Sequence, residues 1–317
     1  MKKAATPPAD SAPAALPATQ GCAAFLAPKG FLADLEKELG DNILATYDHL
    51  ILAKNPGRPI AWAANIWHDP VYIQIDSIGD AAKKLRAIQR NWALYPFALH
   101  RRAALITDNL PKVSAKPLAF GDAAPQSPLG SWTLIDANTI LAAPHCSSAF
   151  PNGEINFIEN HIDSPSRAYL KLWDVFTVLG IGPKQGDFCL DLGACPGGWT
   201  WVLQTRGAKI LSVDKAPLDP KIAALPNVEY RAESAFALDP RTIGPVDWLF
   251  SDIVCYPKRL LTLVQKWLEA GTVKHFVCTI KFQGETDFET VKQFAAIPGS
   301  QILHLHHNKH ELTWIKL

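Results

Sequence analysis

The sequence lacks several features that would assign the chain to a specialised class of protein. Its 317 residues include six cysteines but no CxxC pair, which argues against a zinc site or a disulfide framework and favours reduced thiols in the cytoplasm. No apolar run approaches the roughly 18–20 residues that a membrane span requires. The net charge is only +1. Attraction to nucleic acid must therefore come from local patches rather than from the molecule as a whole.

Chain length and the N-terminal composition indicate how the chain is divided. A chain of 317 residues exceeds the usual size of one domain, so we expect two. Residues 1–20 are rich in Ala and Pro and have no continuous apolar stretch, so they predict a disordered tail rather than a signal peptide. We place an N-terminal domain at residues 21–155 and a C-terminal domain at residues 160–317.

The first of these domains has the pattern of an α/β or ferredoxin-like module. Residues 31–39 carry apolar side chains on one helical stripe, and residues 70–75 alternate as a strand does. Residues 81–95 return to helical spacing, and residues 116–131 predict a loop rich in Pro, Gly, Ala and Ser. Helices and strands therefore alternate in this half, but no repeat is evident.

A basic run in the same half is a candidate RNA-binding surface. Between positions 83 and 116 there is one acid, Asp108, against eight basic residues: Lys83, Lys84, Arg86, Arg90, Arg101, Arg102, Lys112 and Lys116. Trp92, Tyr95 and Phe97 are interleaved among them. Phosphates require cations and unstacked bases require flat partners, so the combination suits RNA. The alternative is a solvated helix face above core aromatic residues.

The second half alternates between predicted strands and helices. Strands are expected at residues 187–192, 209–214, 228–231, 246–252, 273–280, 301–307 and 311–317. Helical stretches, such as residues 258–270 and 286–296, separate most of them. Only three residues join the last two strands, which is too few for a parallel crossover, so these strands form an antiparallel hairpin. The pattern predicts a mostly parallel α/β sheet that ends in an antiparallel strand.

A glycine-rich loop follows the first strand of this sheet. The sequence "LDLGACPGGWTWVL" places Gly193, Gly197 and Gly198 where a ligand can approach the backbone at a helix start. Asp214 ends the next strand, at a spacing that suits the ribose hydroxyls of a nucleoside cofactor. The loop is not G-x-G-x-x-G, and Pro196 removes one N–H donor, which favours S-adenosylmethionine over a dinucleotide. A purely structural glycine turn is the alternative.

These motifs resemble those of the FtsJ-type RNA ribose 2′-O-methyltransferases, in the same order along the chain. The matching blocks are "DLGACPGGWT", "DKAPLDP", "SRAYLKL", "SDIVCYP", "IKFQGETDF" and "HELTW". Within that superfamily the chain is most similar to the RlmM group, which methylates a cytidine ribose in 23S rRNA. The resemblance implies a Rossmann-like methyltransferase sheet, S-adenosylmethionine as cofactor, and a shortened, divergent N-terminal half of the ferredoxin-like and THUMP type. It also implies that 23S rRNA or a large-subunit precursor is the partner, and that the protein is a monomer.

The family's Lys-Asp-Lys-Glu tetrad corresponds to Lys171, Asp252, Lys281 and Glu311. The expected sheet supports this assignment independently, because Asp252 and Lys281 close two parallel strands at one rim. Glu311 opens an antiparallel strand whose start lies at the same rim, and Lys171 lies on a predicted helix at residues 166–179. Four charged side chains that are distant in the sequence are therefore expected to meet beside the glycine loop.

Methyl transfer to a ribose gives each member of the tetrad a possible role. A 2′-OH is a poor nucleophile until its proton is removed in the transition state, and the methyl group must lie in line with it. We assign Lys281 as the general base, oriented by Asp252, while Lys171 and Glu311 position the hydroxyl and the ribose. Repulsion from Lys171 favours proton loss from Lys281, whereas Asp252 and Glu311 oppose it.

The resemblance also implies a set of cofactor-binding residues. The methionine end is expected near the glycine loop and the helix that follows it, and the ribose at Asp214. Glu233 or Ser234 takes the place of the acid that the family usually has near adenine. The full candidate set is Asp191, Gly193, Pro196, Gly197, Gly198, Trp199, Asp214, Glu233, Ser234 and Asp252. Trp199 and Trp201 are alternatively core residues of a helix face.

Two other functions remain open on the sequence. A cytosine-5 RNA methyltransferase would need a cysteine nucleophile, for which Cys255 is the candidate and Cys278 a weaker one, although the Pro-Cys pair typical of such enzymes is absent. A non-catalytic RNA-binding assembly factor would retain the cofactor pocket without the chemistry. The tetrad argues against this second alternative, and an NAD oxidoreductase would have no use for Lys281 and Glu311. The Asn/Asp-Pro-Pro-Tyr motif of amino methyltransferases is absent.

Overall fold

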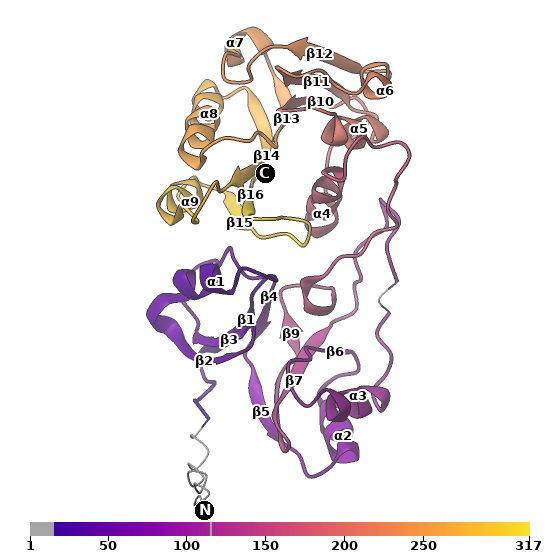
Figure 1. Ribbon diagram of the computed structural model, residues 1–317, viewed down its shortest axis with the longest axis vertical. Coiled ribbons are helices and arrows are strands. Elements are labelled where there is room, and N and C mark those ends of the chain that lie inside the picture. Colours follow the sequence, from indigo (N-terminus) through magenta and orange to yellow (C-terminus); the bar gives the residue numbers. More distant parts are fainter. Residues whose placement is uncertain (1–15, 115) are drawn as a thin grey trace, which may run out of the picture.

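The computed structural model describes residues 16–114 and 116–317, so most of the predicted tail at residues 1–20 lies outside the described residues. Figure 1 shows an elongated molecule with the N-terminal region at one end and the C-terminal region at the other. Three sheets account for the strands of the described residues, two in the N-terminal region and one in the C-terminal region. No helix in this part of the chain combines the length and the apolar character needed to cross a membrane.

The C-terminal sheet has the order β12-β11-β10-β13-β14-β16-β15. Strands β10 to β14 pair in parallel, whereas β16 pairs antiparallel with both β14 and β15. The strands are β10 (Phe188–Leu192), β11 (Lys209–Asp214), β12 (Val228–Ala232), β13 (Val246–Ser251), β14 (Val273–Lys281), β15 (Ser300–Leu303) and β16 (Glu311–Lys316). This confirms the predicted, mostly parallel α/β sheet with an antiparallel last strand.

Helices cover both faces of this sheet (Figure 1). They are α4 (Tyr169–Leu179), α5 (Gly198–Thr205), α6 (Pro220–Ala223), α7 (Pro240–Ile243), α8 (Pro257–Ala270) and α9 (Phe288–Ala295). Successive strand residues point to opposite faces: Leu190 joins the core beneath α8 and α9, whereas Cys189 joins the core beneath α4 and α5. Because both faces of the central strands are buried, β10, β13 and β14 are largely apolar, which is why their sequence pattern was clear.

The N-terminal region contains two smaller sheets rather than one. The first has the order β2-β3-β1-β4-β9 and the second β5-β8-β7-β6. The first comprises β1 (Cys22–Leu26), β2 (Ile43–Tyr47), β3 (Leu50–Lys54), β4 (Asn65–His68) and β9 (His145–Cys146), with α1 (Leu32–Leu39) and the 3₁₀ turn Gly40–Asn42. The second comprises β5 (Val71–Gln74), β6 (Trp92–Leu94), β7 (Gly130–Asp136) and β8 (Thr139–Ala143), with α2 (Ile78–Ile88) and α3 (His100–Asp108). A second 3₁₀ turn, Pro151–Gly153, follows.

Three predicted elements differ from the structure. The helix expected at residues 81–95 ends at Ile88, because Trp92 begins β6 and pairs in parallel with β7. The strand expected at residues 301–307 ends at Leu303, so the last hairpin has a longer loop than the three residues predicted. The loop expected at residues 116–131 ends one residue before Gly130, where β7 begins.

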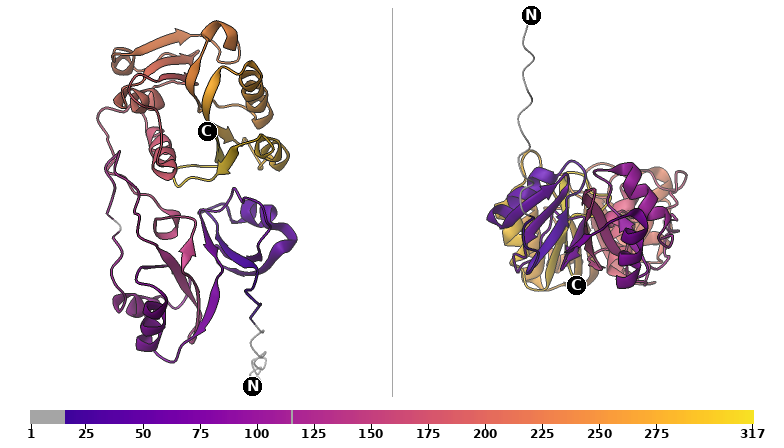
Figure 2. Two further views of the ribbon diagram at one scale, coloured as in Figure 1. Left: turned by 180° about the vertical axis from the view of Figure 1, so that it is seen from behind. Right: turned by 90° about the horizontal axis from the view of Figure 1, so that it is seen from below.

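The first N-terminal sheet and its helix α1 pack against the C-terminal region (Figure 2). One continuous apolar core contains Leu35 of α1 and Trp62 together with Phe282 and Trp314 of the C-terminal region. Polar contacts reinforce it: the hydroxyl of Thr286 donates a hydrogen bond to Asp34 at 2.5 Å. Burial of a shared core makes this contact unlike a flexible hinge between independent domains.

Candidate active site

The glycine loop begins where β10 ends and is shaped by close packing. Gly193 has φ +80°, and a Cβ there would lie 2.6 Å from Cγ1 of Ile253, so a side chain has neither the conformation nor the room. Gly197 has φ +111° and precedes the first turn of α5, and the Cys195–Pro196 peptide bond is cis. The loop therefore brings the backbone to the carboxyl ends of β10 and β13, which is where ligands of such sheets bind.

A cavity of about 420 Å³ opens at this edge of the sheet. Five of the predicted cofactor residues line it: Gly193, Asp214, Glu233, Ser234 and Asp252. The sequence analysis did not single out the further lining side chains Lys215, Phe236, Val254 and Arg259, and Arg259 stacks its guanidinium 3.9 Å from the ring centre of Phe236. Lys215, Phe236 and Val254 lie in loops and Arg259 lies in the first turn of α8, so no spacing rule marks them in the sequence.

Asp214 is held at the cavity by the backbone. One carboxylate oxygen accepts a hydrogen bond from the N–H of Cys195 at 3.1 Å, and the other accepts one from the N–H of Ala216 at 3.0 Å. The hydroxyl of Tyr230 donates to the carbonyl of Asp214 at 3.1 Å. Each oxygen keeps lone pairs for a ligand, so the residue has the acceptor chemistry and the fixed position that ribose hydroxyls require.

The remaining predicted cofactor residues do not line the cavity. Trp199 is buried, and its indole N–H donates to the carbonyl of Ala168 at 3.0 Å, so it joins α5 to the start of α4. Trp201 is also buried in the core, as the alternative interpretation of these tryptophans held. Pro196, Gly197 and Gly198 shape the loop and the helix start.

Asp191 lies beneath the loop, fully buried. It accepts a hydrogen bond from the hydroxyl of Thr200 at 2.7 Å. Burial raises the pKa of this carboxyl to about 7, although the hydrogen bond from Thr200 opposes the rise. Asp191 therefore connects β10 to α5 and has no contact with solvent.

The four predicted catalytic residues meet at the rim of the cavity. Lys171 places its Nζ 2.8 Å from Asp252 Oδ1 and 3.0 Å from Glu311 Oε1. Lys281 places its Nζ 3.0 Å from Asp252 Oδ1 and donates to the carbonyl of Asp252 at 2.6 Å. Lys281 and Glu311 are also direct cross-strand partners in the β14–β16 pair. We refer to Lys171, Asp252, Lys281 and Glu311 as the tetrad.

The two lysines of the tetrad have different surroundings. Lys171 lies between two carboxylates: burial lowers its pKa, but the charges of Asp252 and Glu311 outweigh this effect and raise it. Among the described residues Lys281 has an ion pair with Asp252 only, and of the two tetrad lysines it is the one that lines the cavity. Lys171 is therefore a fixed cation, and Lys281 faces the space in which a substrate would lie.

Glu311 owes its position to the loop between β15 and β16. Its Oε1 also accepts hydrogen bonds from the N–H of Lys309 at 3.3 Å and from the amide of Asn308 at 3.4 Å. The neighbouring His310 stacks on Phe31 of the N-terminal region, with ring centres 5.5 Å apart. The N-terminal region thus packs against the loop that positions Glu311. The sequence alone did not predict this contact.

The cysteines considered as nucleophiles are poorly placed for that role. Cys255 is 6% exposed, and burial raises the pKa of its thiol, which disfavours the reactive thiolate. Cys278 is completely buried, and burial raises the pKa of its thiol as well. The cysteine that does lie at the cavity is Cys195, in the glycine loop.

The basic run lies on α2, α3 and the segments beside them. Lys83, Arg86, Arg90 and Arg101 are exposed, whereas Lys84 forms an ion pair with Asp80 at 2.8 Å. Arg102 is half-buried, and Lys112 and Lys116 lie on the exposed segment that follows α3.

Of the aromatic residues between these charges, Trp92 is buried, and Tyr95 and Phe97 are half-buried. The indole N–H of Trp92 donates to the carbonyl of Leu85 at 3.0 Å. Tyr95 donates its hydroxyl hydrogen to Asp48 at 2.7 Å, and its ring stacks on Phe97. The charges are therefore available to a partner, but Trp92 is not.

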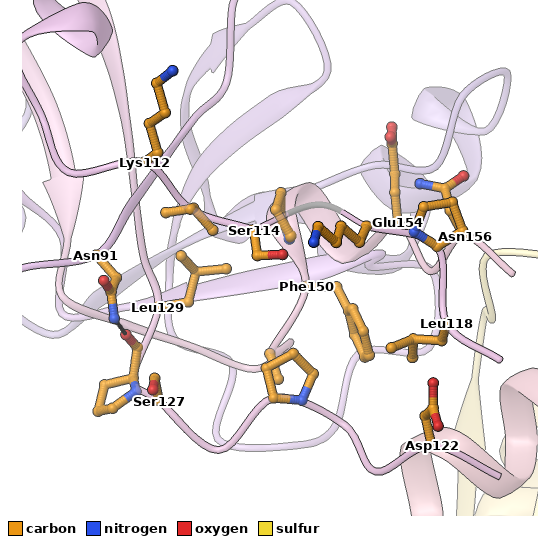
Figure 3. Close-up of a pocket in the computed structure, with 17 residues that line it drawn as sticks. Asn91, Lys112, Ser114, Leu118, Asp122, Ser127, Leu129, Phe150, Glu154 and Asn156 are labelled. Carbon is orange, nitrogen blue, oxygen red and sulfur yellow. Dashed lines mark hydrogen bonds between the residues drawn. The ribbon is translucent and has the colours of Figure 1, made fainter. Parts of the chain in front are cut away.

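A second cavity, of about 540 Å³, lies between the segment after α3 and the second 3₁₀ turn (Figure 3). Lys112 and Lys116 line it, but so do the acids Asp122 and Glu154. A hydrogen bond from the amide of Asn91 to the carbonyl of Pro128, at 3.2 Å, closes one side. Because charges of both signs line this cavity, it shows no preference for one class of ligand.

Comparison with known proteins identifies the C-terminal region. Residues 165–295 match the FtsJ-like methyltransferase family. This segment is an FtsJ-like methyltransferase domain. Proteins of this family use S-adenosylmethionine, which is therefore the cofactor of the domain.

Curated relatives cover about half of the chain. The "Ribosomal RNA large subunit methyltransferase M" of Halorhodospira halophila is 35% identical over 159 residues, which are 48% of this chain and 46% of that protein. The protein of the same name from Thauera aminoaromatica is 30% identical over 186 residues, 54% of this chain and 50% of that protein. The chain thus spans about half the length of these relatives. A solved structure described as a hemolysin from Streptococcus thermophilus is 20% identical, with a TM-score of 0.40, and covers 52% of this chain and 72% of that one.

Proposed function

We propose that the protein transfers a methyl group from S-adenosylmethionine to a ribose 2′-OH of RNA, and that its target is a cytidine of 23S rRNA. The observation that carries the proposal is the tetrad: two lysines and two carboxylates from four separate elements meet at the rim of the cofactor cavity, and Lys281 faces into it. The rRNA target is supported by the names of the curated relatives. A cytoplasmic monomer that acts on the rRNA or on a large-subunit precursor would fit this role.

The cavity suits the cofactor. It lies at the carboxyl ends of β10, β11 and β13, and Asp214 offers carboxylate acceptors for ribose hydroxyls. Glu233 and Ser234 supply further polar groups after β12, where the adenine would bind. When bound, S-adenosylmethionine supplies a methyl group on a positively charged sulfur, and the carbon–sulfur bond breaks as the ribose oxygen bonds to the methyl carbon.

In this proposal Lys281 accepts the proton of the 2′-OH as that oxygen attacks. Two lysines and two carboxylates balance one another's charge in the tetrad. Asp252 holds the Nζ of Lys281 through its carboxylate and its carbonyl, which fixes the direction of the lone pair. Lys171 stays charged between its two carboxylates and, with Glu311, positions the ribose.

The test is methyl transfer from labelled S-adenosylmethionine into total RNA of a strain that lacks this protein, followed by nuclease digestion and nucleoside analysis. We expect label in 2′-O-methylcytidine from 23S rRNA, and its loss in Lys281→Ala. The matched control is Lys274→Ala, which removes an exposed lysine from the other end of the same strand. If Lys281→Ala keeps kcat within a few-fold of wild type at every pH, the base assignment is wrong.

Other labelled products would replace the proposal. Label in 5-methylcytidine would indicate a cytosine-5 methyltransferase with a cysteine nucleophile, despite the burial of Cys255. Cofactor binding without any label, on naked RNA and on ribosomal particles alike, would indicate a non-catalytic RNA-binding protein.

A further inference from the structure

The segment that joins β13 to α8 combines buried and exposed apolar residues beside the tetrad. Exposure alternates along it: Ile253 is half-buried, Val254 is 73% exposed, Cys255 is buried and Tyr256 is 67% exposed. A chain of four residues spans at most about 14 Å, so Tyr256 lies within that distance of Asp252. Two apolar side chains therefore project into solvent at the edge of the catalytic centre.

The exposure of Tyr256 is exceptional within this protein. The described residues include all 10 tryptophans, 6 tyrosines and 14 phenylalanines of the chain, and Tyr256 is the one among them that is mainly exposed. Scattered exposed aliphatic residues are ordinary on protein surfaces. The other aromatic rings of the chain are buried or partly buried, whereas this one is mainly exposed four residues from Asp252, an arrangement that suits contact with a partner outside the chain.

The backbone beneath Tyr256 is rigidly held. Asp252 donates its N–H to the carbonyl of Leu192, and the Nζ of Lys281 bonds to the carbonyl of Asp252 at 2.6 Å. Ile253 packs against Gly193 of the cofactor loop. The carbonyl of Tyr256 accepts from the N–H of Arg259 at 2.9 Å in the first turn of α8. The segment is thus fixed by the cofactor loop, the proposed base and a helix, so the exposed ring stands on a well-defined support.

The charges around Tyr256 are those that a nucleic acid would need. Lys258 and Arg259 follow Pro257 in the first turn of α8, and both are exposed. The carboxylates of Asp252 and Glu311 at the catalytic centre are paired with the tetrad lysines. Within the described residues neither Lys258 nor Arg259 forms an ion pair. A flat ring followed by exposed cations matches the pattern of sites for single-stranded RNA, in which bases stack on aromatic rings and phosphates bind cations.

We propose that Tyr256 is the stacking platform for an unpaired nucleobase of the RNA substrate at the catalytic centre. This inference rests on the proposed function, because it assumes that RNA approaches the tetrad. Stacking the base on Tyr256 fixes the nucleotide on a rigid part of the protein, which helps to align its 2′-OH with Lys281. Lys258 and Arg259 bind the adjoining phosphates.

The test is the affinity of the full chain for a fluorescein-labelled dodecamer of cytidine ribonucleotides, measured by anisotropy over a range of salt concentrations. Tyr256→Ala is expected to weaken binding roughly 5- to 100-fold without altering the salt dependence, because base stacking involves no counterion release. Tyr256→Phe and Tyr256→Trp should retain affinity. Lys258→Ala should instead reduce the slope of affinity against salt.

Two controls accompany these variants. Val178→Ala removes an exposed aliphatic side chain from α4, well away from the segment after β13 in sequence, and should leave affinity unchanged. Affinity for S-adenosylmethionine should be the same in all variants. Because Tyr256 is exposed, Tyr256→Ala should also keep the Tm of wild type.

Several results would overturn the proposal. They are wild-type affinity in Tyr256→Ala, an equal loss in Tyr256→Phe, or no binding of the dodecamer by the wild type. Loss of ribosomal-particle binding in Tyr256→Ala, with dodecamer affinity intact, would assign the ring to a protein contact instead. If methyl transfer is absent in the wild type but dodecamer binding depends on Tyr256, the stacking platform stands and the proposed enzymatic function is wrong.

Discussion

The molecule has two clusters of charged residues, and they differ in how they are assembled. The tetrad draws its members from α4, the end of β13, the end of β14 and the start of β16, and their side chains are between 7% and 17% exposed. The basic run comes from one continuous stretch of sequence, and most of its side chains on α2 and α3 extend into solvent. The members of the tetrad form ion pairs with one another. In the basic run, Lys84 alone forms an ion pair within the described residues.

This difference shows which kind of charge cluster is evidence of chemistry. Burying a charge is costly unless it is paired, so four partly buried charges that meet have been retained for a reason other than solubility. Exposed charges cost little and are common. The tetrad therefore argues for a specific reaction, whereas the basic run argues only for attraction to a polyanion.

The largest effect is expected from Asp252→Asn. Asp252 is the carboxylate that both tetrad lysines share, so its loss leaves the base without its orienting partner. We expect methyl transfer to fall roughly 10²- to 10⁴-fold, as when a positioned acid–base group is disrupted. The matched control is Asp247→Asn. Asp247 lies at the start of β13, at the opposite end of the strand from Asp252, and forms an ion pair with Lys274. Equal losses in both variants would remove the distinction between a catalytic and a surface carboxylate.

The next effect concerns the contact between the two regions. Trp62 is completely buried and contacts the rings of Phe31, His304 and His310. Trp62→Ala should lower the free energy of unfolding by roughly 3–5 kcal/mol, measured in urea. Because His310 adjoins Glu311, kcat should fall as well. Ile88→Ala, at an exposed position on α2, should change neither quantity. Stability within about 1 kcal/mol of wild type in Trp62→Ala would mean that the regions are not one cooperative unit.

A third effect is the pH dependence that Asp191 introduces. Its pKa is about 7 in the folded protein, above its ordinary value of 3.8. Between these pH values the folded state binds a proton that the unfolded state does not, so this group stabilises the fold less as the pH rises. Between pH 5 and pH 7 the loss should be roughly 2–3 kcal/mol at about 1.4 kcal/mol per pH unit. Asp191→Asn removes this contribution, so the two proteins should diverge in Tm with pH; parallel curves would contradict the prediction.

The smallest effect is expected in the basic run. Arg86→Ala combined with Arg101→Ala should reduce the slope of log affinity against log salt by roughly 1.4 for single-stranded RNA, and should lower affinity at low salt several-fold. Cofactor affinity should not change. Lys292→Ala, an exposed lysine on α9 that lies near Glu289, is the control. An unchanged slope would mean that Arg86 and Arg101 do not contact the RNA phosphates, and would restrict the RNA-binding surface to the C-terminal region.

The sequence predicted the C-terminal region well because its local and global signals agree. Buried parallel strands are continuous apolar runs, and amphipathic helices separate them, so each element was visible in its own residues. The rim position of Asp252 and Lys281 followed from their places at strand ends. Their convergence with Lys171 and Glu311 is confirmed by the contacts between them, whereas their catalytic roles remain predictions.

The N-terminal region was harder to predict because tertiary pairing overrides local preference there. Residues 89–95 follow an amphipathic helix without a glycine or proline to end it, yet Trp92 to Leu94 pair with β7 as a strand. Each of the two sheets also pairs strands that are distant in the sequence. In the first sheet β4 pairs with β9, and in the second β5 pairs with β8. Trp199 was likewise expected at the cofactor, but it packs against the start of α4.

The sequence by itself determined the type of sheet and the position of the glycine loop, because apolar strands, amphipathic helices and clustered small residues are visible in local segments. Its resemblance to the FtsJ-type enzymes supplied the four charged residues of the tetrad, and the expected strand ends supported that assignment. Only the tertiary structure decided which tetrad lysine faces the cavity, that the N-terminal region braces the loop of Glu311, and that Tyr256 alone among the aromatic residues is mainly exposed. These features depend on packing between segments far apart in the chain. No local pattern encodes such contacts, because burial is a property of the assembled fold.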